Sequence, residues 1–570
     1  MEKLRADIPT TVATAPEQAD KQCSPRSNLP MFSFSFANAA KVSRIVRGMT
    51  NTTALGVDGI PTLVLKRGIE VLAGPISHLI NRSLASSTVP SGFKTGRVIP
   101  VFKGKGKATT DPASYRPISL LPALSKVLEL AVKEDLELHL AKVNGLPTCQ
   151  FGFRPKRSTS TAVGSAHANW LAAAQKGKAV GVLAFDFSSA FDTVDPQTLL
   201  SKLDASGVRG SANKWFESYL RDGSQFVVWE EATSAPIRVK YGVRQGSILG
   251  PLLFITLMND LPESISTPTE EIAAYADDIT MWCTGDIKSV ESNLNKRALA
   301  FTTYAKANGL SLNCSKTQLL LAGKISAAGR SNFSVVVDNA TISPGKSLEF
   351  LGLSVDSSLC IDTSGAAKAA RHKAAVIGRL ACHLPKGQYL RQLANGVLLG
   401  KIGYAAAAVA PLRLTDSDPA SVSTKAIQVA INKAARSVVG TRLLDKIPTK
   451  ELLAMSGMPS YNRLVVRTVA LEAWKAFVSC DGPDGTRNPL GVILFGDHGN
   501  SSSTGQAPTV LDRPSRATVS GCIKPPLPIA AQTMVQSIYR VWNTCAPLRA
   551  ARTLGEARRA ATALANSAPL

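Results

Sequence analysis

The sequence predicts an α+β fold that combines an antiparallel sheet with helices. Two short apolar runs of β type, residues 272–275 and 279–282, flank a pair of acidic residues, as in a β-hairpin. Apolar residues recur at helical spacing over residues 123–142. Beyond residue 363, alanine, lysine and arginine dominate, which favours further helices.

The first 36 residues are polar and rich in Pro, Ser and Thr, so we expect little order there. A helical stretch should follow over residues 37–87. Residues 97–102 resemble a strand and lead into the basic run KGKGK at 103–107, which we expect at a hairpin tip. In the helix predicted over 123–142, the leucines, including Leu138, are expected in the core.

The second half of the chain is expected to be mainly helical, with helices in residues 366–380 and 425–439. Residues 481–525 are rich in Gly, Ser and Pro and predict a flexible linker. The last segment, 526–570, contains an Ala/Arg-rich stretch and predicts one or two helices.

Asp277 and Asp278 are the most informative pair in the chain. Neighbouring side chains on a strand point to opposite faces, so both acids can serve one site only at a tight turn. A hairpin with an acidic tip is therefore expected. Without cations the two charges would repel each other, and hard oxygen ligands of this kind suit magnesium. A solvated surface pair is the structural alternative.

Asp186 is the second candidate, within the apolar run 180–187 that reads as a buried strand. A carboxylate there is costly unless it is paired or bound to metal. A capping acid that accepts backbone amides is the alternative. Together with the acidic hairpin, Asp186 predicts a metal site.

Several ordered blocks make the chain resemble the reverse transcriptases of non-LTR (LINE-type) retrotransposons. Besides the two acidic motifs, the blocks are SYRPISLL at 114–121, QFGFR at 150–154, GVRQGSILGPL at 242–252, NGLSLN at 308–313 and FLG at 350–352. The resemblance is close over about residues 55–360. It implies a right-hand polymerase with fingers, a palm with an antiparallel sheet and a helical thumb, plus a helical C-terminal extension.

The resemblance implies nucleotidyl transfer with two Mg²⁺ ions, or Mn²⁺ in their place, about 3.5 to 4 Å apart. Asp186 and Asp277 are expected to be the principal metal ligands, and Asp278 a third. The backbone carbonyl of Phe187 is implied to complete one coordination shell. Lys316 resembles the family lysine proposed to protonate the departing pyrophosphate, with an ordinary surface lysine as the alternative.

Three cations are candidates to bind the triphosphate of the nucleotide: Arg116 first, then Lys103 and Lys105. Guanidinium binds phosphate through two parallel hydrogen bonds, whereas ammonium acts as a point charge. The run at 103–107 lacks the spacing of a P-loop.

Phe191 is expected to lie under the sugar of the incoming nucleotide and to exclude a 2′-hydroxyl, as the resemblance implies. The alternative is that its ring only packs the palm. Gln245 and Gly246 are expected to open a helix after a turn, where glycine lets the backbone approach nucleotide and template.

Contacts with template or primer are expected from Arg154, Tyr275, and the turn of Phe350, Leu351 and Gly352, which resembles the family's primer grip. Composition and the resemblance together suggest the domain boundaries: a disordered segment (1–36), N-terminal helices and fingers (37–179), palm (180–358), thumb and connection (359–480), linker (481–525) and C-terminal helices (526–570).

The composition agrees with a nucleic-acid partner, because the formal net charge is +24 and the sequence pI is near 9.8. The expected partners are an RNA template, a DNA primer or target, and deoxynucleoside triphosphates. No membrane span or secretory segment is expected. The nine scattered cysteines suggest a reduced intracellular compartment, and element biology suggests the nucleus.

No endonuclease motif is evident, so we expect a nuclease to be supplied by another part of the element product or in trans. Two other interpretations remain open. One is a catalytically silent, retroelement-derived protein that binds RNA or DNA. The other is a maturase like those of group II introns, for which a splicing-associated thumb and a metal-binding nuclease would be expected.

Overall fold

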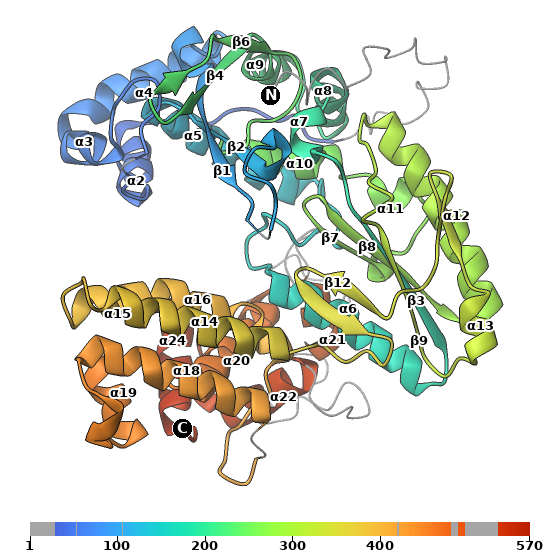
Figure 1. Cartoon of the computed structure of the whole chain (residues 1–570). Coiled ribbons are helices and arrows are strands. Elements are labelled where there is room, and N and C mark those ends of the chain that lie inside the picture. Colours follow the sequence, from blue (N-terminus) through green and yellow to red (C-terminus); the bar gives the residue numbers. More distant parts are fainter. Residues whose placement is uncertain (1–28, 53, 105, 419–420, 480–487, 496–533) are drawn as a thin grey trace. The chain divides into compact units, whose positions relative to one another are not determined.

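The computed structural model describes residues 29–52, 54–104, 106–418, 421–479, 488–495 and 534–570 (Figure 1). The chain divides into two compact units. Unit 1 comprises Met1–Pro147, Asp186–Thr267 and Arg297–Ser315, and unit 2 comprises Thr148–Phe185, Pro268–Lys296 and Lys316–Leu570. Among the described residues, no helix is both long enough and apolar enough to cross a lipid bilayer.

Unit 1 contains a five-stranded sheet. Strand β1 (Thr95–Phe102) pairs antiparallel with β2 (Tyr115–Leu120) and parallel with β4 (Gly223–Trp229). The short strands β5 (Ala232–Thr233) and β6 (Ile237–Val239) both pair with β4. The β1–β2 hairpin, with the basic run at its tip, is confirmed.

The helices of unit 1 pack mainly against one another. The helix predicted over 123–142 is confirmed as α5 (Ala123–Lys142), but Leu138 is 72% exposed rather than in the core. Near the end of α5 the packed side is that of Leu136 and Leu140, so Leu138 faces solvent. The other α-helices of unit 1 are α2 (Ala39–Gly48), α3 (Thr62–Arg67), α4 (Ile69–Ala85), α7 (Ala190–Thr193), α8 (Pro196–Ala205), α9 (Gly210–Leu220), α10 (Gly250–Leu257) and α11 (Leu261–Ser264).

Unit 2 contains a four-stranded sheet in the order β7-β8-β3-β9. The strands are β7 (Ile272–Tyr275), β8 (Asp278–Gly285), β3 (Ala179–Phe185) and β9 (Gln318–Ala322), and each neighbouring pair is antiparallel. Six of the seven residues of β3 are buried, as expected for a central strand. The predicted antiparallel sheet is therefore confirmed.

The remaining elements of unit 2 are two hairpins and a helical region. The hairpins join β10 (Val335–Val337) to β11 (Ala340–Ile342) and β12 (Ser347–Phe350) to β13 (Leu353–Asp356). The helices are α6 (Thr159–Gln175), α13 (Ala327–Ser331), α14 (Ser364–Leu380), α15 (Gln388–Ala394), α16 (Gly400–Gly403), α17 (Ala406–Val409), α18 (Val422–Val439), α19 (Thr449–Ser456), α20 (Tyr461–Val478), α21 (Pro489–Phe495), α22 (Met534–Thr544), α23 (Ala546–Arg549) and α24 (Leu554–Ser567); helix α12 (Ile287–Ala307) begins in unit 2 and ends in unit 1.

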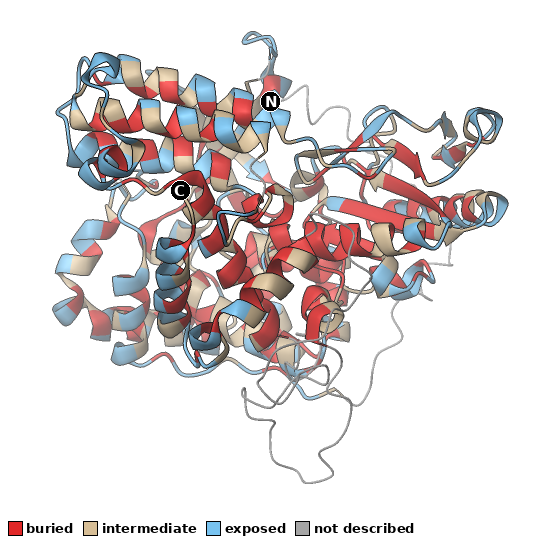
Figure 2. Ribbon diagram, turned by 90° about the horizontal axis from the view of Figure 1, so that it is seen from below, coloured by how far each residue is buried: buried red, intermediate tan, exposed pale blue. Residues whose placement is uncertain are grey.

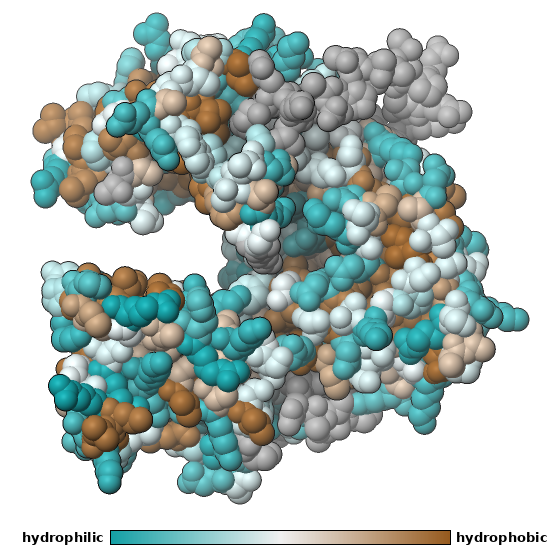
Figure 3. All heavy atoms as spheres, viewed as in Figure 1, coloured by the Kyte–Doolittle hydropathy of each residue, from teal (hydrophilic) through white to brown (hydrophobic). Residues whose placement is uncertain are grey.

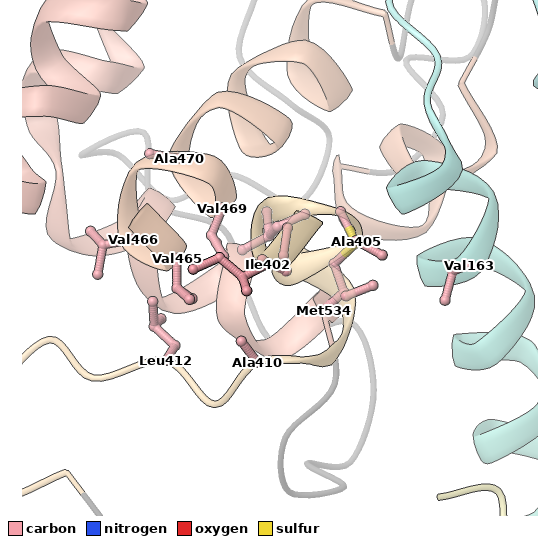
Figure 4. Packing of buried hydrophobic residues seen from close by; sticks show 14 of the residues in the cluster. Val163, Ile402, Ala405, Ala410, Leu412, Val465, Val466, Val469, Ala470 and Met534 are labelled. Atoms are coloured by element: carbon pink, nitrogen blue, oxygen red, sulfur yellow. The ribbon is translucent and has the colours of Figure 1, made fainter. Parts of the chain in front are cut away.

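The hydrophobic core of unit 2 joins parts that are far apart in the sequence. Val163 of α6, Ile402 of α16, Val465 of α20 and Met534 of α22 belong to one buried cluster (Figure 4). Helices of this unit bury one side and expose the other, which Figure 2 shows as red and pale-blue stripes. The C-terminal helices therefore complete a core that begins before the palm strands.

Two of the expected domain boundaries need correction. Helix α6 was expected with the fingers, within 37–179, but it packs in unit 2 against α21 and α22. Within the expected linker 481–525, residues 489–495 form α21, whose Leu490 and Phe495 are buried. Local composition favoured a linker because seven residues are too few to show a helical pattern. The rest of that segment, and most of the segment 1–36, lies outside the described residues.

Trp542 should make a large contribution to the stability of unit 2. Its ring is 1% exposed and lies 4.7 Å from Phe477 and 5.0 Å from Phe495, measured between ring centroids. We expect Trp542→Ala to lower the free energy of unfolding by about 3 to 5 kcal/mol, measured by urea denaturation. As a control, Leu444→Ala, at a side chain that is 84% exposed, should change it by less than about 0.5 kcal/mol. Equal effects of the two changes would contradict this packing.

Candidate active site

The predicted tight hairpin is present: Asp277 lies in its turn, and Asp278 is the first residue of the strand that follows. Strands β7 and β8 pair in register from Ile272 with Met281 to Tyr275 with Asp278, so Ala276 and Asp277 form a two-residue turn. Ala276 has a φ of +58°, which is uncommon for a residue with a side chain. Asp277 is half-buried and Asp278 is exposed.

Asp186 directly follows the strand that pairs with this hairpin. Strand β3 pairs with β8 up to its last residue, where Phe185 lies opposite Ile279. Asp186 is the residue after Phe185, and Asp278 is the residue before Ile279. The predicted strand thus ends at Phe185, two residues earlier than expected.

The segment after β3 leaves that sheet and pairs with the NGLSLN block. The Asp186 carbonyl accepts a hydrogen bond from the Asn313 amide (2.7 Å), and Ser188 donates to the Ser311 carbonyl (2.9 Å). Phe187 lies opposite Leu312 in an isolated bridge. Backbone pairing within unit 1 therefore fixes the chain on the C-terminal side of Asp186, and the NGLSLN block supplies the partner.

Phe191 and Gln245 are held close together within unit 1. The Phe191 ring is half-buried and stacked on Phe254, with centroids 4.5 Å apart. The Phe191 carbonyl accepts a hydrogen bond from the Val243 amide (2.8 Å). Asp192, one residue later, accepts a hydrogen bond from the Gln245 side-chain amide (3.1 Å). This role of Asp192, which ends the same motif as Asp186, was not evident from the sequence.

Gly246 does not open a helix, because α10 begins only at Gly250. Its φ is +115°, and a Cβ atom there would lie 2.4 Å from the Ser119 carbonyl oxygen of β2. Ser119 also donates its amide to the Gln245 carbonyl (2.7 Å). The glycine is thus required for close packing of this loop on β2, the strand that carries Arg116.

The candidate phosphate ligands differ in their surroundings. Arg116 is exposed on β2. Lys103 donates its amide to the Ser114 carbonyl and its ammonium to the Ala113 carbonyl, both at 2.8 Å, so its side chain braces the hairpin end. Lys105 lies outside the described residues.

The FLG turn places only part of its three residues at the surface. Phe350 is 2% exposed and packs against Trp170, so its side chain belongs to the core and cannot contact a primer. Leu351 and Gly352 both have positive φ, +49° and +74°, as in a type I′ hairpin turn. Tyr404 of the loop after α16 donates its hydroxyl to the Leu351 carbonyl (2.7 Å). This contact was not evident from the sequence.

The other expected template or primer residues also belong to unit 2. Burial lowers the pKa of the half-buried Arg154 guanidinium to about 10, so it stays charged at neutral pH. Burial, assisted by the nearby Tyr404, raises the pKa of Tyr275. Lys316 is exposed.

The three expected metal ligands are divided between the units: Asp186 belongs to unit 1, and Asp277 and Asp278 belong to unit 2. In the part of the chain that the structure describes, no three His, Cys, Asp or Glu side chains are grouped as ready ligands of one ion. The donors themselves are carboxylate oxygens, the type that Mg²⁺ prefers.

Residues 103–355 match the family model described as reverse transcriptase (RNA-dependent DNA polymerase). The chain contains a reverse transcriptase domain. Its relatives include proteins of retrotransposable and mobile elements. The matched residues span β2, the acidic hairpin, the loop 242–250 and the turn 350–352.

The relatives include the following three from Drosophila melanogaster. The putative 115 kDa protein in the type-1 retrotransposable element R1DM is 28% identical over 284 residues, 49% of this chain and 27% of that protein. The probable RNA-directed DNA polymerase from transposon BS is 32% identical over 241 residues, 40% of this chain and 25% of that protein. The RNA-directed DNA polymerase from mobile element jockey is 28% identical over 303 residues, 50% of this chain and 31% of that protein.

The chain thus spans about a quarter to a third of the length of these relatives. Among solved structures, apo telomerase from Candida tropicalis matches with a TM-score of 0.38 and 11% identity, over 67% of this chain and 62% of that chain.

A buried glutamate fixes the loop 242–250 of the reverse transcriptase domain. Glu129 of α5 is 1% exposed, and its carboxylate accepts hydrogen bonds from the Ile248 amide (2.7 Å) and the Leu249 amide (3.1 Å). Ser125 donates its hydroxyl to the other carboxylate oxygen (3.2 Å). The sequence indicated only a packing role for α5. The sign of this role in the sequence was Glu129 itself, a charged residue among the apolar positions of the predicted helix.

Burial raises the pKa of Glu129, although the two loop amides oppose the shift. The folded-state pKa of Glu129 is therefore higher than its unfolded-state pKa, which is about 4.3 for Glu. The stability that this group contributes is fully present below the unfolded-state pKa and is lost as pH rises through the folded-state pKa. We therefore expect the unfolding free energy of the wild type, relative to Glu129→Gln, to fall as pH rises above about 4.3.

Urea denaturation at a series of pH values measures this difference. Glu231→Gln, at an exposed position, is the control and should show little pH dependence relative to the wild type. A wild-type advantage over Glu129→Gln that grows with pH would contradict the assignment.

Proposed function

We propose that the chain is an RNA-directed DNA polymerase that extends a primer 3′ end with deoxynucleoside triphosphates on an RNA template. The observation that carries the proposal is the pairing of β3 with β8 through Phe185 and Ile279. It supports a site in which Asp186 joins Asp277 and Asp278, within a domain that matches reverse transcriptases.

The carboxylates of Asp186 and Asp277 would hold the two Mg²⁺ ions of this site, with Asp278 as a third ligand. When bound, such a pair of cations stabilises the attacking primer oxygen and the leaving pyrophosphate oxygen. Asp278 is exposed and belongs to β8 rather than to the turn, so its contribution should be the smallest of the three.

The residues around Asp192 would bind the incoming nucleotide. Asp192 orients the Gln245 side chain, and the loop that carries Gln245 is packed on Ser119 of β2, the strand that also carries the exposed Arg116. Arg116 would bind the triphosphate through paired hydrogen bonds, and Lys103 would add positive charge. The Phe191 ring would limit space at the sugar. Lys316 would act as the general acid toward pyrophosphate.

The helical part of unit 2 would bind the backbone of the template and primer. Exposed basic side chains lie on α14 and α18, among them Lys368, Arg371, Lys425 and Lys433. Hydrophilic side chains gather over these helices in Figure 3, with hydrophobic ones between them. Phosphate contacts of this kind position a duplex without reading its sequence. The tip residues Leu351 and Gly352 would support the primer end.

Target-primed copying in the nucleus, with an endonuclease from elsewhere in the element product or in trans, is the setting that this proposal implies. A catalytically silent protein that binds RNA or DNA is the second candidate, and the high positive charge favours it as much as it favours a polymerase. Loss of activity on changing the three acids separates the two.

The carboxylates should be essential for primer extension. On poly(rA) with an oligo(dT) primer and Mg²⁺, we expect Asp186→Asn and Asp277→Asn to lower kcat by about 10²-fold or more, because several kcal/mol of charge stabilisation is lost. Asp278→Asn should have a smaller effect.

Asp286→Asn is the matched control, because this exposed acid lies just beyond the opposite end of β8 and caps α12 through the Ser289 amide. It should leave kcat unchanged. Template binding without extension by the wild-type protein would identify the silent binder instead.

Phe191 should select the sugar of the nucleotide. Phe191→Val removes the ring bulk, so the ratio of kcat/KM for dNTP over NTP should fall by on the order of 10-fold or more. Phe191→Tyr keeps the bulk and should keep the ratio. Unchanged discrimination in a folded Phe191→Val protein would show that the ring serves only to pack against Phe254.

A further inference from the structure

The QFGFR block supplies an extra extended segment beside the acidic hairpin. The Ala274 amide donates to the Cys149 carbonyl (2.9 Å), and the Phe151 amide donates to the Ala274 carbonyl (2.7 Å). Gln150 thus lies in a parallel bridge with Ala274 of β7. Strand β7 therefore pairs with β8 on one side and with this segment on the other.

The Gln150 side chain reaches along the hairpin to its turn. Gln150 is 1% exposed, and its side-chain oxygen accepts hydrogen bonds from the Gly152 amide (2.8 Å) and the Ala276 amide (3.1 Å). Ala276 is the first turn residue, and it is 4% exposed. A buried backbone amide at a turn needs a partner, and here the partner is a side chain 126 positions away.

Gly152 permits the close contact on which this hydrogen bond depends. A Cβ atom at Gly152 would lie 2.5 Å from the Ala276 nitrogen and 3.0 Å from the Tyr275 carbonyl carbon. The first distance is shorter than a Cβ contact can be, the second is very tight, and the opposing atoms are backbone atoms that cannot rotate away. The segment therefore contacts the turn at two points, the side-chain oxygen of Gln150 and the backbone of Gly152.

We propose that Gln150 is a positioning residue of the active site: by binding the Ala276 amide it holds the turn in its positive-φ conformation and thereby sets the direction of the Asp277 carboxylate. The proposal rests on the proposed function only for the role of Asp277. Glutamine suits this place because it offers an acceptor without charge, whereas a carboxylate would add a negative charge near Asp277.

The test compares Gln150→Met with the wild type in the full chain. Methionine has similar length and no strong acceptor, so the Ala276 amide should lose protection and exchange hydrogen faster. Primer extension should then need about 10- to 100-fold more Mg²⁺ for half-maximal rate, the range found when groups that orient metal ligands are removed.

Asn169→Ala is the matched control. Asn169 donates to the Glu270 carbonyl (3.1 Å), just before β7, and does not contact the turn. It should change neither the exchange of the Ala276 amide nor the Mg²⁺ requirement. Gly152→Ala is a second variant, for use if Gln150→Met does not fold. It leaves Gln150 in place but forces the segment away from the turn, and both readouts should shift in the same direction.

Unchanged Ala276 exchange, or an unchanged Mg²⁺ requirement, in a folded variant would overturn the proposal. Hydrogen exchange does not require catalysis, so it separates this proposal from the proposed function. If the wild-type protein fails to extend a primer, the polymerase proposal fails. Faster hydrogen exchange of the Ala276 amide in Gln150→Met would still establish that Gln150 holds the turn.

Discussion

The antiparallel pairing of β3 with β8 is the constraint on which the candidate site depends. Side chains alternate along a strand, so a slip of one residue would turn every side chain of β3 to the other face of the sheet. Buried residues on the central strand β3 resist such a slip. The register therefore fixes the backbone at Phe185 against Ile279, the residues next to Asp186 and Asp278 in the sequence.

Two loops, one in each unit, share one type of construction: a buried polar side chain accepts backbone amides, and a glycine allows close backbone contact. Glu129 holds the amides of Ile248 and Leu249, and Gly246 packs against β2. Gln150 holds the amide of Ala276, and Gly152 packs against the same turn. Such contacts hold a loop in one conformation through its backbone.

Local patterns in the sequence predicted the local structure well. The hairpin at 275–278, the hairpin around 103–114 and the helix 123–142 follow from alternation, turn residues and helical spacing. Contacts between distant segments were not predictable in this way, which is why the placement of α6, α21 and the last helices in one core was missed. The roles of Glu129, Asp192 and Tyr404 likewise depend on partners far away in the sequence. The residues of the candidate site were named from a family resemblance, and their convergence stays a prediction.

The most direct test is a crystal structure of the protein with Mn²⁺, a primer–template and a non-hydrolysable dNTP, with Mn²⁺ located by anomalous scattering. Two peaks about 3.5 to 4 Å apart, each within coordination distance of a carboxylate oxygen of Asp186 or Asp277, are the predicted result. Mn²⁺ bound elsewhere, or Asp186 too far from Asp277 to share the ion pair, would contradict a polymerase site built on the β3–β8 pairing.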